Sequence, residues 1–210
     1  MTVRFLGVDI ETGPGALIPR AETELLGETA LAKLRATGAT LLDVCCGTGN
    51  LACALATAMP ELRAWALDLT DGAVALARAN VARLGLTDRV TVLQGDLFAP
   101  LAGQLAGEVD VVVCNPPYIS TAKLATRADL AHEPREAFDG GPYGVTIHQR
   151  VAREAAPLLR AGGWLVCELG LGQARQVELV LQRARAYDSI ELVSDTAGAP
   201  RVIAARKQLS

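Results

Sequence analysis

The sequence predicts a doubly wound α/β fold with a mostly parallel sheet, and three observations support that prediction. From residue 39 onward, short hydrophobic runs alternate with helical patterns. These runs have no polar face, as is typical of strands covered on both faces of a parallel sheet. At the end of the chain, two strand-like runs have only the turn TAGA between them, which predicts an antiparallel hairpin at the sheet edge.

The elements follow in order along the chain. The Gly- and Pro-rich segment up to Pro19 predicts a strand plus a loop, and Glu22 and Glu24 suit the first turn of a helix that begins after it. The predicted helices are 21–36, 50–58, 71–84, 145–160 and 172–186. The predicted strands are 40–44, 64–68, 89–94, 109–115, 163–169, 189–195 and 200–206.

Length and composition favour one globular domain over 1–210, in which 1–38 leads into a core of 39–210. A net charge of −3 argues against a broad nucleic-acid footprint, and 4% aromatic residues argue against a base-stacking platform. No apolar run approaches the ~18 residues of a membrane span, and no signal peptide is evident. Five cysteines, an odd number, favour a reducing compartment, and two histidines offer no zinc spacing. We expect a cytoplasmic protein without a metal or a membrane partner.

A glycine loop follows the first core strand and opens a helix, which is the usual position of a nucleotide-binding loop. Its residues are Asp43, Val44, Cys45, Cys46, Gly47, Thr48, Gly49 and Asn50. Gly47 permits a tight turn, and Gly49 permits close approach of the backbone to a ligand. Asp68 ends the next strand, where a carboxylate accepts both hydroxyls of an adenosine ribose, and Asp96 ends the third strand, within reach of an adenine amino group.

Other interpretations of this loop stay open at this point. Gly47 and Gly49 with Asp68 also fit a nicotinamide-dinucleotide fingerprint, or simply a tight strand-to-helix turn. Asp96 is also a candidate helix N-cap, and Asp43 a candidate for orienting the loop backbone. The cysteines of the loop are better interpreted as small filling residues than as nucleophiles, because no histidine lies near them in sequence.

The most specific motif is Asn115-Pro116-Pro117-Tyr118, directly after the fourth core strand. Neither proline has a backbone N–H, so the loop lacks two donors and keeps its carbonyl acceptors. Pro117 makes Pro116 extended and stiff, Asn115 adds a side-chain acceptor, and Tyr118 supplies an aromatic ring. Such a site suits a planar –NH2 group, whose two hydrogens meet two acceptors. The alternative is a stiff turn that only ends a strand.

This arrangement addresses a chemical problem. The nitrogen of an amide is a weak nucleophile because its lone pair is delocalised. Acceptors placed out of the amide plane favour a more tetrahedral nitrogen, and positioning and electrostatics then carry most of a methyl transfer. Asn115, Pro116 and Tyr118 are therefore the predicted catalytic residues, and water suffices as the proton acceptor.

These motifs resemble the HemK-like release-factor glutamine methyltransferases over nearly the whole chain. Ile18 to Glu24 is similar to the family's Pro-Arg…Thr-Glu entry motif, and Asp195-x-x-Gly198-x-x-Arg201 to its closing hairpin. His132-Glu133-Pro134-Arg135 with Gly140-Gly141 resembles the stretch after the Asn-Pro-Pro-Tyr loop. The resemblance implies a seven-stranded class I methyltransferase sheet and N5-methylation of a glutamine side chain by S-adenosylmethionine, with S-adenosylhomocysteine as product. The implied cofactor contacts are Asp43, Cys45, Cys46, Gly47, Thr48, Gly49, Asp68, Asp96, Leu97 and Asn115.

The resemblance also implies partners, with some departures. The implied substrate contacts are Asn115 to Tyr118 with Arg20, and the implied partner is a peptide release factor, with an activator subunit in some relatives. Cys45 stands where the first loop glycine is usual, and Pro142-Tyr143 where an acidic residue is usual. The sequence is expected to be the catalytic domain alone, without the helical N-terminal domain of bacterial members. Oligomeric state is left open.

Four further functions stay open from sequence alone. They are small-molecule N-methylation, methylation of a nucleic-acid base that stacks on Tyr118, a non-enzymatic scaffold role, and a nicotinamide oxidoreductase. Acidic charge argues against the nucleic acid. Arg20 suits either the mouth of the site or a surface ion pair. His132 and His148 are expected to be structural, and contact of Glu133 or His132 with the substrate is undecided.

Overall fold

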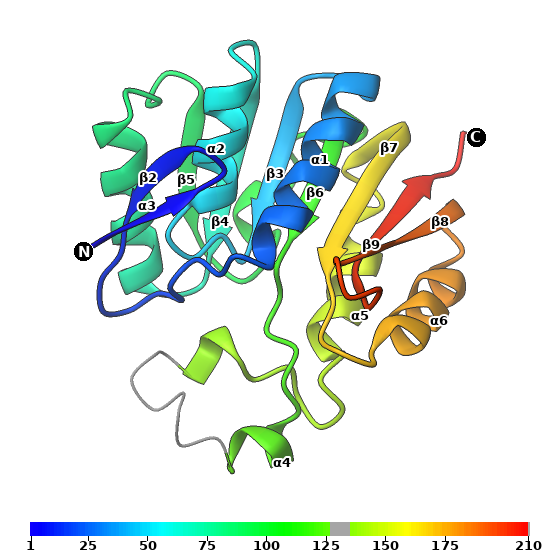
Figure 1. Cartoon of the computed structure of the whole chain (residues 1–210). Helices are drawn as coiled ribbons and strands as arrows, with labels where there is room; N and C mark the ends of the chain where they lie inside the picture. The colour runs from blue at the N-terminus through cyan, green and yellow to red at the C-terminus, as the bar shows by residue number, and fades with distance from the viewer. Residues whose placement is uncertain (127–134, 210) are drawn as a thin grey trace.

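The computed structural model describes residues 1–126 and 135–209 and confirms the predicted α/β fold with its mostly parallel sheet (Figure 1). The sheet has seven strands in the order β5-β4-β3-β6-β7-β9-β8. In chain order these strands are β3 (Thr40–Val44), β4 (Arg63–Asp68), β5 (Val90–Gln94), β6 (Val109–Cys114), β7 (Leu159–Glu168), β8 (Tyr187–Ser194) and β9 (Pro200–Lys207).

The five strands β3 to β7 run parallel, and β9 is antiparallel to both β7 and β8. Successive strands step outward from β3 to β5, and then the chain returns so that β6 pairs with the other side of β3. Strand order therefore reverses between β3 and β6. In open parallel sheets, ligands bind outside the carboxyl ends of the strands at such a reversal.

The N-terminal segment differs from the single strand that the sequence predicts. It forms a two-stranded antiparallel hairpin of β1 (Thr2–Phe5) and β2 (Val8–Glu11). The two turn residues Leu6 and Gly7 both have positive φ angles, 44° and 80°. Two-residue hairpin turns favour this conformation because its twist matches that of the strands, and glycine or asparagine usually marks both positions. Because leucine stands at the first position, the sequence did not indicate this turn.

Helices cover both faces of the sheet, and a hydrophobic core lies on each side (Figure 1). The hairpin and helices α1 to α3 pack on one face, and helices α5 and α6 pack on the other. The helices are α1 (Thr23–Thr37), α2 (Asn50–Ala58), α3 (Asp71–Arg83), α5 (Thr146–Ala155) and α6 (Ala174–Ala184). Short helical turns are η1 (Ala99–Leu101), α4 (Thr121–Leu124) and η3 (Arg135–Ala137).

Element boundaries shift where proline intervenes. The sequence predicts a helix to residue 160, but α5 ends at Ala155 and β7 begins already at Leu159. Pro157 lies between them, and proline has no N–H for a helical hydrogen bond. Within residues 1–126 and 135–209, no helix is long and apolar enough to cross a membrane. The same part of the chain holds no cluster of three or more metal-ligating side chains.

Candidate active site

Two adjoining cavities lie at the carboxyl ends of the parallel strands. The first, of about 300 Å³, is bounded by the loops after β3, β4, β5 and β6 and by the segment that precedes α1. The second, of about 510 Å³, is bounded by the Asn-Pro-Pro-Tyr loop, the end of β7 and the start of β9. The two cavities share four lining residues, namely Leu17, Arg20, Asn115 and Ala137. Asn115 therefore lies on the boundary between them.

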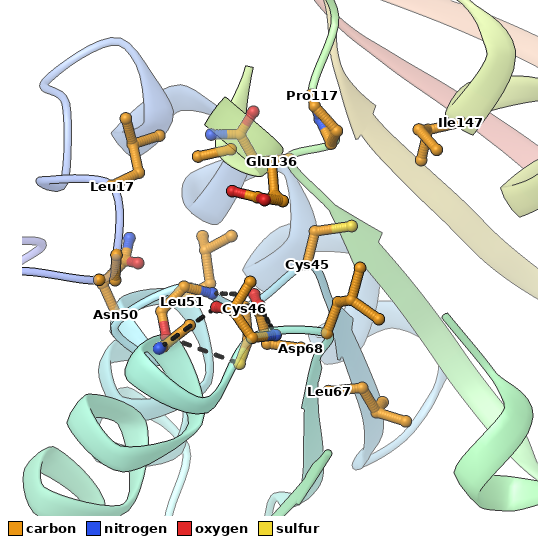
Figure 2. A pocket seen from close by; sticks show the side chains of 18 of the residues that line it. Leu17, Cys45, Cys46, Asn50, Leu51, Leu67, Asp68, Pro117, Glu136 and Ile147 are labelled. Atoms are coloured by element: carbon orange, nitrogen blue, oxygen red, sulfur yellow. Dashed lines mark hydrogen bonds between the residues drawn. The ribbon is translucent and has the colours of Figure 1, made fainter. Parts of the chain in front are cut away.

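The glycine loop forms the floor of the first cavity. Cys45, Cys46 and Gly47 line it, and Figure 2 shows both cysteines beside Asp68. Gly47 has a φ of 55°, and a Cβ atom added to it would meet no atom within 4 Å. Its missing side chain therefore leaves open space above the backbone, which suits the approach of a ligand.

Gly49 packs against a neighbouring helix. It does not line either cavity described here, and a Cβ atom added to it would lie 3.1 Å from the Cβ of Ala77 in α3. Its φ of 73° is also in the left-handed region. Glycine at this position therefore permits a turn that brings the start of α2 against α3.

Asp68 fixes the loop from the end of β4. Its Oδ2 accepts a hydrogen bond of 2.9 Å from the backbone N–H of Gly47, and its Oδ1 accepts one of 3.1 Å from that of Thr70. Oδ1 also accepts a hydrogen bond of 3.2 Å from the Thr70 hydroxyl, so Oδ2, with a single hydrogen bond, is the oxygen that keeps acceptor capacity. Asp68 and Thr70 both line the first cavity.

Two of the predicted contact residues lie beneath the loop and not at the cavity. Asp43 and Thr48 are fully buried, and neither lines a cavity. The Oδ2 of Asp43 accepts a 3.0 Å hydrogen bond from the backbone N–H of Ala52. Burial raises the pKa of Asp43 to about 7, against the lowering effect of that hydrogen bond. This geometry matches the alternative in which Asp43 orients the backbone at the start of α2.

Asp96 and Leu97 reach the first cavity from the end of β5, as the sequence places them. Asp96 is not free to turn, because its Oδ1 lies 2.9 Å from Nη1 of Arg150 in α5. Its carboxylate is half-exposed, so this ion pair is worth little by itself. It does hold the carboxylate at the mouth of the cavity.

The Asn-Pro-Pro-Tyr loop separates the two cavities. Pro116 and Tyr118 line the second cavity, and Pro117 lines the first. The Nδ2 of Asn115 donates a 3.3 Å hydrogen bond to Oγ1 of Thr23, at the start of α1. The carbonyl Oδ1 of Asn115 is thereby turned away from Thr23 and is left as an acceptor.

Neighbouring loops hold this motif from behind. Gln173 donates from Nε2 to the backbone oxygen of Tyr118 at 2.9 Å and accepts at Oε1 from Gly170 N–H at 3.0 Å. A Cβ atom added to Gly140 would lie 2.8 Å from the backbone oxygen of Pro117, so only glycine permits this contact. Gln173, which follows β7, and the turn at Gly140 thus hold the Asn-Pro-Pro-Tyr loop, which follows β6.

Sequence reasoning missed a buried carboxylate at this site. Glu168, at the end of β7, is 1% exposed and lines the second cavity. Its Oε1 accepts a 3.3 Å hydrogen bond from the Tyr118 hydroxyl and lies 3.9 Å from Nη2 of Arg201. Burial raises the pKa of Glu168, while hydrogen bonds from Thr23 and Tyr118 and the charge of Arg201 lower it. The available signal was a charged residue inside the apolar run GWLVCEL.

The remaining predicted residues fall into two groups. Arg20 lines both cavities, which favours its placement at the mouth of the site. His148 is structural, as predicted, because it is buried and its Nε2 lies 2.9 Å from the backbone oxygen of Glu168. His132 and Glu133 lie outside the described residues.

Comparisons with known proteins place this geometry in a family. Residues 21–137 match the model of the methyltransferase small domain. A release factor glutamine methyltransferase of Moorella thermoacetica is 39% identical over 206 residues, which cover 97% of this chain and 72% of the relative. The protein of the same name from Geobacter sulfurreducens is 39% identical over 98% of this chain and 70% of the relative.

Solved structures agree on the fold. A methyltransferase of Pyrococcus furiosus superposes with a TM-score of 0.66 over 96% of this chain and 90% of that one, at 18% identity. The hMettl16 catalytic domain, in complex with a MAT2A 3′UTR hairpin, gives a TM-score of 0.72 over 98% of this chain and 77% of that one, at 15% identity. Such low identities establish the fold alone.

The reversal of strand order and these structural neighbours define the class I methyltransferase fold. Within that class, the chain belongs to the release factor glutamine methyltransferase family, and the resemblance drawn from its motifs is confirmed. The protein is therefore an enzyme that transfers a methyl group from a donor molecule to an acceptor.

Proposed function

We propose that this enzyme transfers a methyl group from S-adenosylmethionine to the side-chain amide nitrogen of a glutamine in a peptide release factor. The observation that carries the proposal is the position of Asn115, which belongs to the walls of both cavities. A donor in one cavity and an acceptor amide in the other would meet at this residue. The names of the relatives supply the protein substrate.

The first cavity fits the nucleoside part of this cofactor. Asp68 offers a carboxylate at the cavity wall, and its Oδ2, which accepts only the hydrogen bond from Gly47, keeps acceptor capacity for a ribose hydroxyl. Gly47 leaves open space above its backbone, and Leu67, Leu69 and Leu97 give the cavity apolar walls. We assign Asp68 to the ribose, Asp96 and Leu97 to the adenine, and the loop from Cys45 to Gly47 to the tail of the cofactor. When bound, S-adenosylmethionine supplies an electrophilic methyl group on a sulfonium.

The residues of the second cavity prepare the amide. Asn115 Oδ1 and the carbonyl of Pro116 accept its two N–H groups, and the ring of Tyr118 covers its plane. These contacts localise the lone pair on nitrogen and aim it at the first cavity. Transfer would form the new C–N bond and break the S–CH3 bond of the donor, which would leave as S-adenosylhomocysteine, while the amide N–H bond breaks and its proton passes to water. Asp43, Thr48 and Gly49 support the loop without touching either ligand.

The test is methyl transfer to a purified release factor, followed by mass spectrometry of the peptide that contains its Gly-Gly-Gln sequence. One added methyl group on that glutamine is the expected result. An unmodified peptide, with cofactor binding confirmed by calorimetry, would contradict the protein substrate and favour a small molecule or a required activator subunit. A release factor with alanine in place of the glutamine is the control.

A further inference from the structure

The wall of the second cavity contains a buried polar cluster centred on the carboxylate of Glu168. Tyr118 donates its hydroxyl proton to Oε1 at 3.3 Å, and the side chain of Thr23 lowers the pKa of the same carboxylate, which is the effect of a hydrogen-bond donor. Arg201 forms an ion pair with this carboxylate, with Nη2 3.9 Å from Oε1. Within the described chain, Glu168 Oε2 and Arg201 Nε are buried without a hydrogen-bond partner. The negative charge of Glu168 is therefore only partly compensated.

Thr23 links this carboxylate to Asn115. A hydroxyl group has one proton to donate, and the lowering effect of Thr23 on the pKa of Glu168 indicates that this proton points to the carboxylate. The oxygen of Thr23 then offers only lone pairs to Asn115, so the amide must present its Nδ2 side, at 3.3 Å. The opposite orientation would set two acceptors against each other. The chain from Glu168 through Thr23 thus determines that Asn115 presents its carbonyl Oδ1 as the acceptor.

We propose that Glu168 is a positioning residue that sets the specificity of the second cavity for a neutral amide over a carboxylate. It does so by fixing Oδ1 of Asn115 as an acceptor and by placing a negative charge behind it. The proposal rests on the proposed function and names the feature by which that site distinguishes glutamine from glutamate.

The two side chains have nearly the same shape, so the distinction requires charge and hydrogen bonding. A carboxamide has two N–H donors for the acceptors of the loop, whereas a carboxylate has none and meets the like charge of Glu168. A site built to bind an N–H group discriminates strongly against an analogue that lacks it, because its buried acceptors are then left unpaired. Neutralising Glu168 would leave Arg201 without its anionic partner, which favours a carboxylate ligand.

The experiment measures the affinity of a release factor and of its Gln→Glu variant, each in the presence of S-adenosylhomocysteine. We expect the unmodified enzyme to bind the glutamine form at least tenfold more tightly. In the Glu168→Gln enzyme, the ratio of the two dissociation constants should fall to within about threefold of unity or invert. Glu191→Gln is the matched control, because Glu191 is an exposed carboxylate paired with Lys33 outside both cavities, and its ratio should stay unchanged.

A ratio in Glu168→Gln that equals the original ratio would overturn the inference. If that variant does not fold, Thr23→Val tests the relay alone, because valine has the same shape without the hydroxyl. We expect its kcat to fall at least tenfold while the cofactor dissociation constant stays within threefold, and an unchanged kcat would overturn the relay. An unmodified enzyme that binds neither form of the release factor contradicts the proposed function itself, and the inference with it.

Discussion

The side-chain amide of Gln173 crosses from the segment after β7 to the backbone oxygen of Tyr118, at 2.9 Å. The same Nε2 also lies 3.2 Å from the backbone oxygen of Gly144. One side chain therefore ties together the Asn-Pro-Pro-Tyr loop and the turn that packs against it. Two hydrogen bonds of this kind contribute roughly 1 kcal/mol each.

Replacing Gln173 with leucine should loosen the acceptor side of the site and spare the cofactor side. We expect KM for the release factor to rise about tenfold, because the loop that meets the substrate loses its support, with cofactor affinity unchanged. Steady-state kinetics and calorimetry measure the two effects. Gln176→Leu, on an exposed position of α6, is the control and should behave like the original enzyme. A Gln173→Leu enzyme with normal KM would show that this support is dispensable.

Removal of the Asn115 side chain should abolish turnover without abolishing cofactor binding. Asn115→Ala loses the acceptor at the boundary of the two cavities, but the contacts assigned to Asp68 and the glycine loop remain. We expect S-adenosylmethionine to bind within about tenfold of its original affinity, or ~1.4 kcal/mol. Methyl-transfer assays and calorimetry on the same preparation measure both quantities. Retained turnover would rule out the proposed role of Asn115.

Asp68→Ala should weaken the cofactor far more than the substrate. The variant loses the proposed ribose acceptor and the hydrogen bond to Gly47 N–H that fixes the loop. We expect the dissociation constant of S-adenosylmethionine to rise at least tenfold, or ~1.4 kcal/mol, with a much smaller change for the release factor. Asp71→Ala, at the first residue of α3 and not itself part of the cavity wall, is the control. Equal weakening of both ligands would count against the assignment.

Cys45 occupies a backbone conformation that favours glycine, with a φ of 59°. We expect Cys45→Gly to preserve cofactor affinity and to change the free energy of unfolding by less than about 1 kcal/mol, because relief of strain offsets lost packing. Cys45→Val should destabilise by roughly 1 to 2 kcal/mol, since a β-branched side chain tolerates this region worst. Urea denaturation of the two variants compares them directly. Equal stability of both would remove the argument from backbone strain.

His148 should make the fold sensitive to acid. Burial lowers its pKa to about 4 from an ordinary value of 6.5, against the raising effect of its hydrogen bond to Glu168. The unfolded chain therefore binds a proton near pH 6.5 while the folded chain resists it until about pH 4. Stability associated with neutral His148 is complete above pH 6.5 and falls by about 3 kcal/mol as the pH drops to 4.

The measurement is the free energy of unfolding against pH for the original enzyme and for His148→Gln. We expect the glutamine variant to be less stable at neutral pH, because the imidazole is buried, but to lose less stability between pH 6.5 and 4. Parallel curves for the two proteins would mean that other groups account for the acid sensitivity.

Much of the architecture was predictable because short stretches of sequence determine the individual strands, helices and turns. Continuous hydrophobic runs predicted the parallel strands, the final TAGA turn predicted the edge hairpin, and loops after strands predicted the place of the site. The exceptions have local causes as well. Leu6 is an unusual residue for a hairpin turn, so the first hairpin was not predicted. Pro157 follows the end of a helix that periodicity alone extends to residue 160.

The sequence by itself determined the class of fold, the family and the two motifs, since each depends on residues close together in the chain. Only the tertiary structure decided how those motifs are supported. Thr23 from α1, Glu168 from β7 and Arg201 from β9 meet behind Asn115 and Tyr118 because parallel strands bring their carboxyl ends to one edge of the sheet, where β9 begins. These three residues are far apart in the sequence, so their spacing does not predict that they lie close together. The same packing showed that Gly49 lies against Ala77 of α3, a neighbour that its position in the loop motif did not indicate.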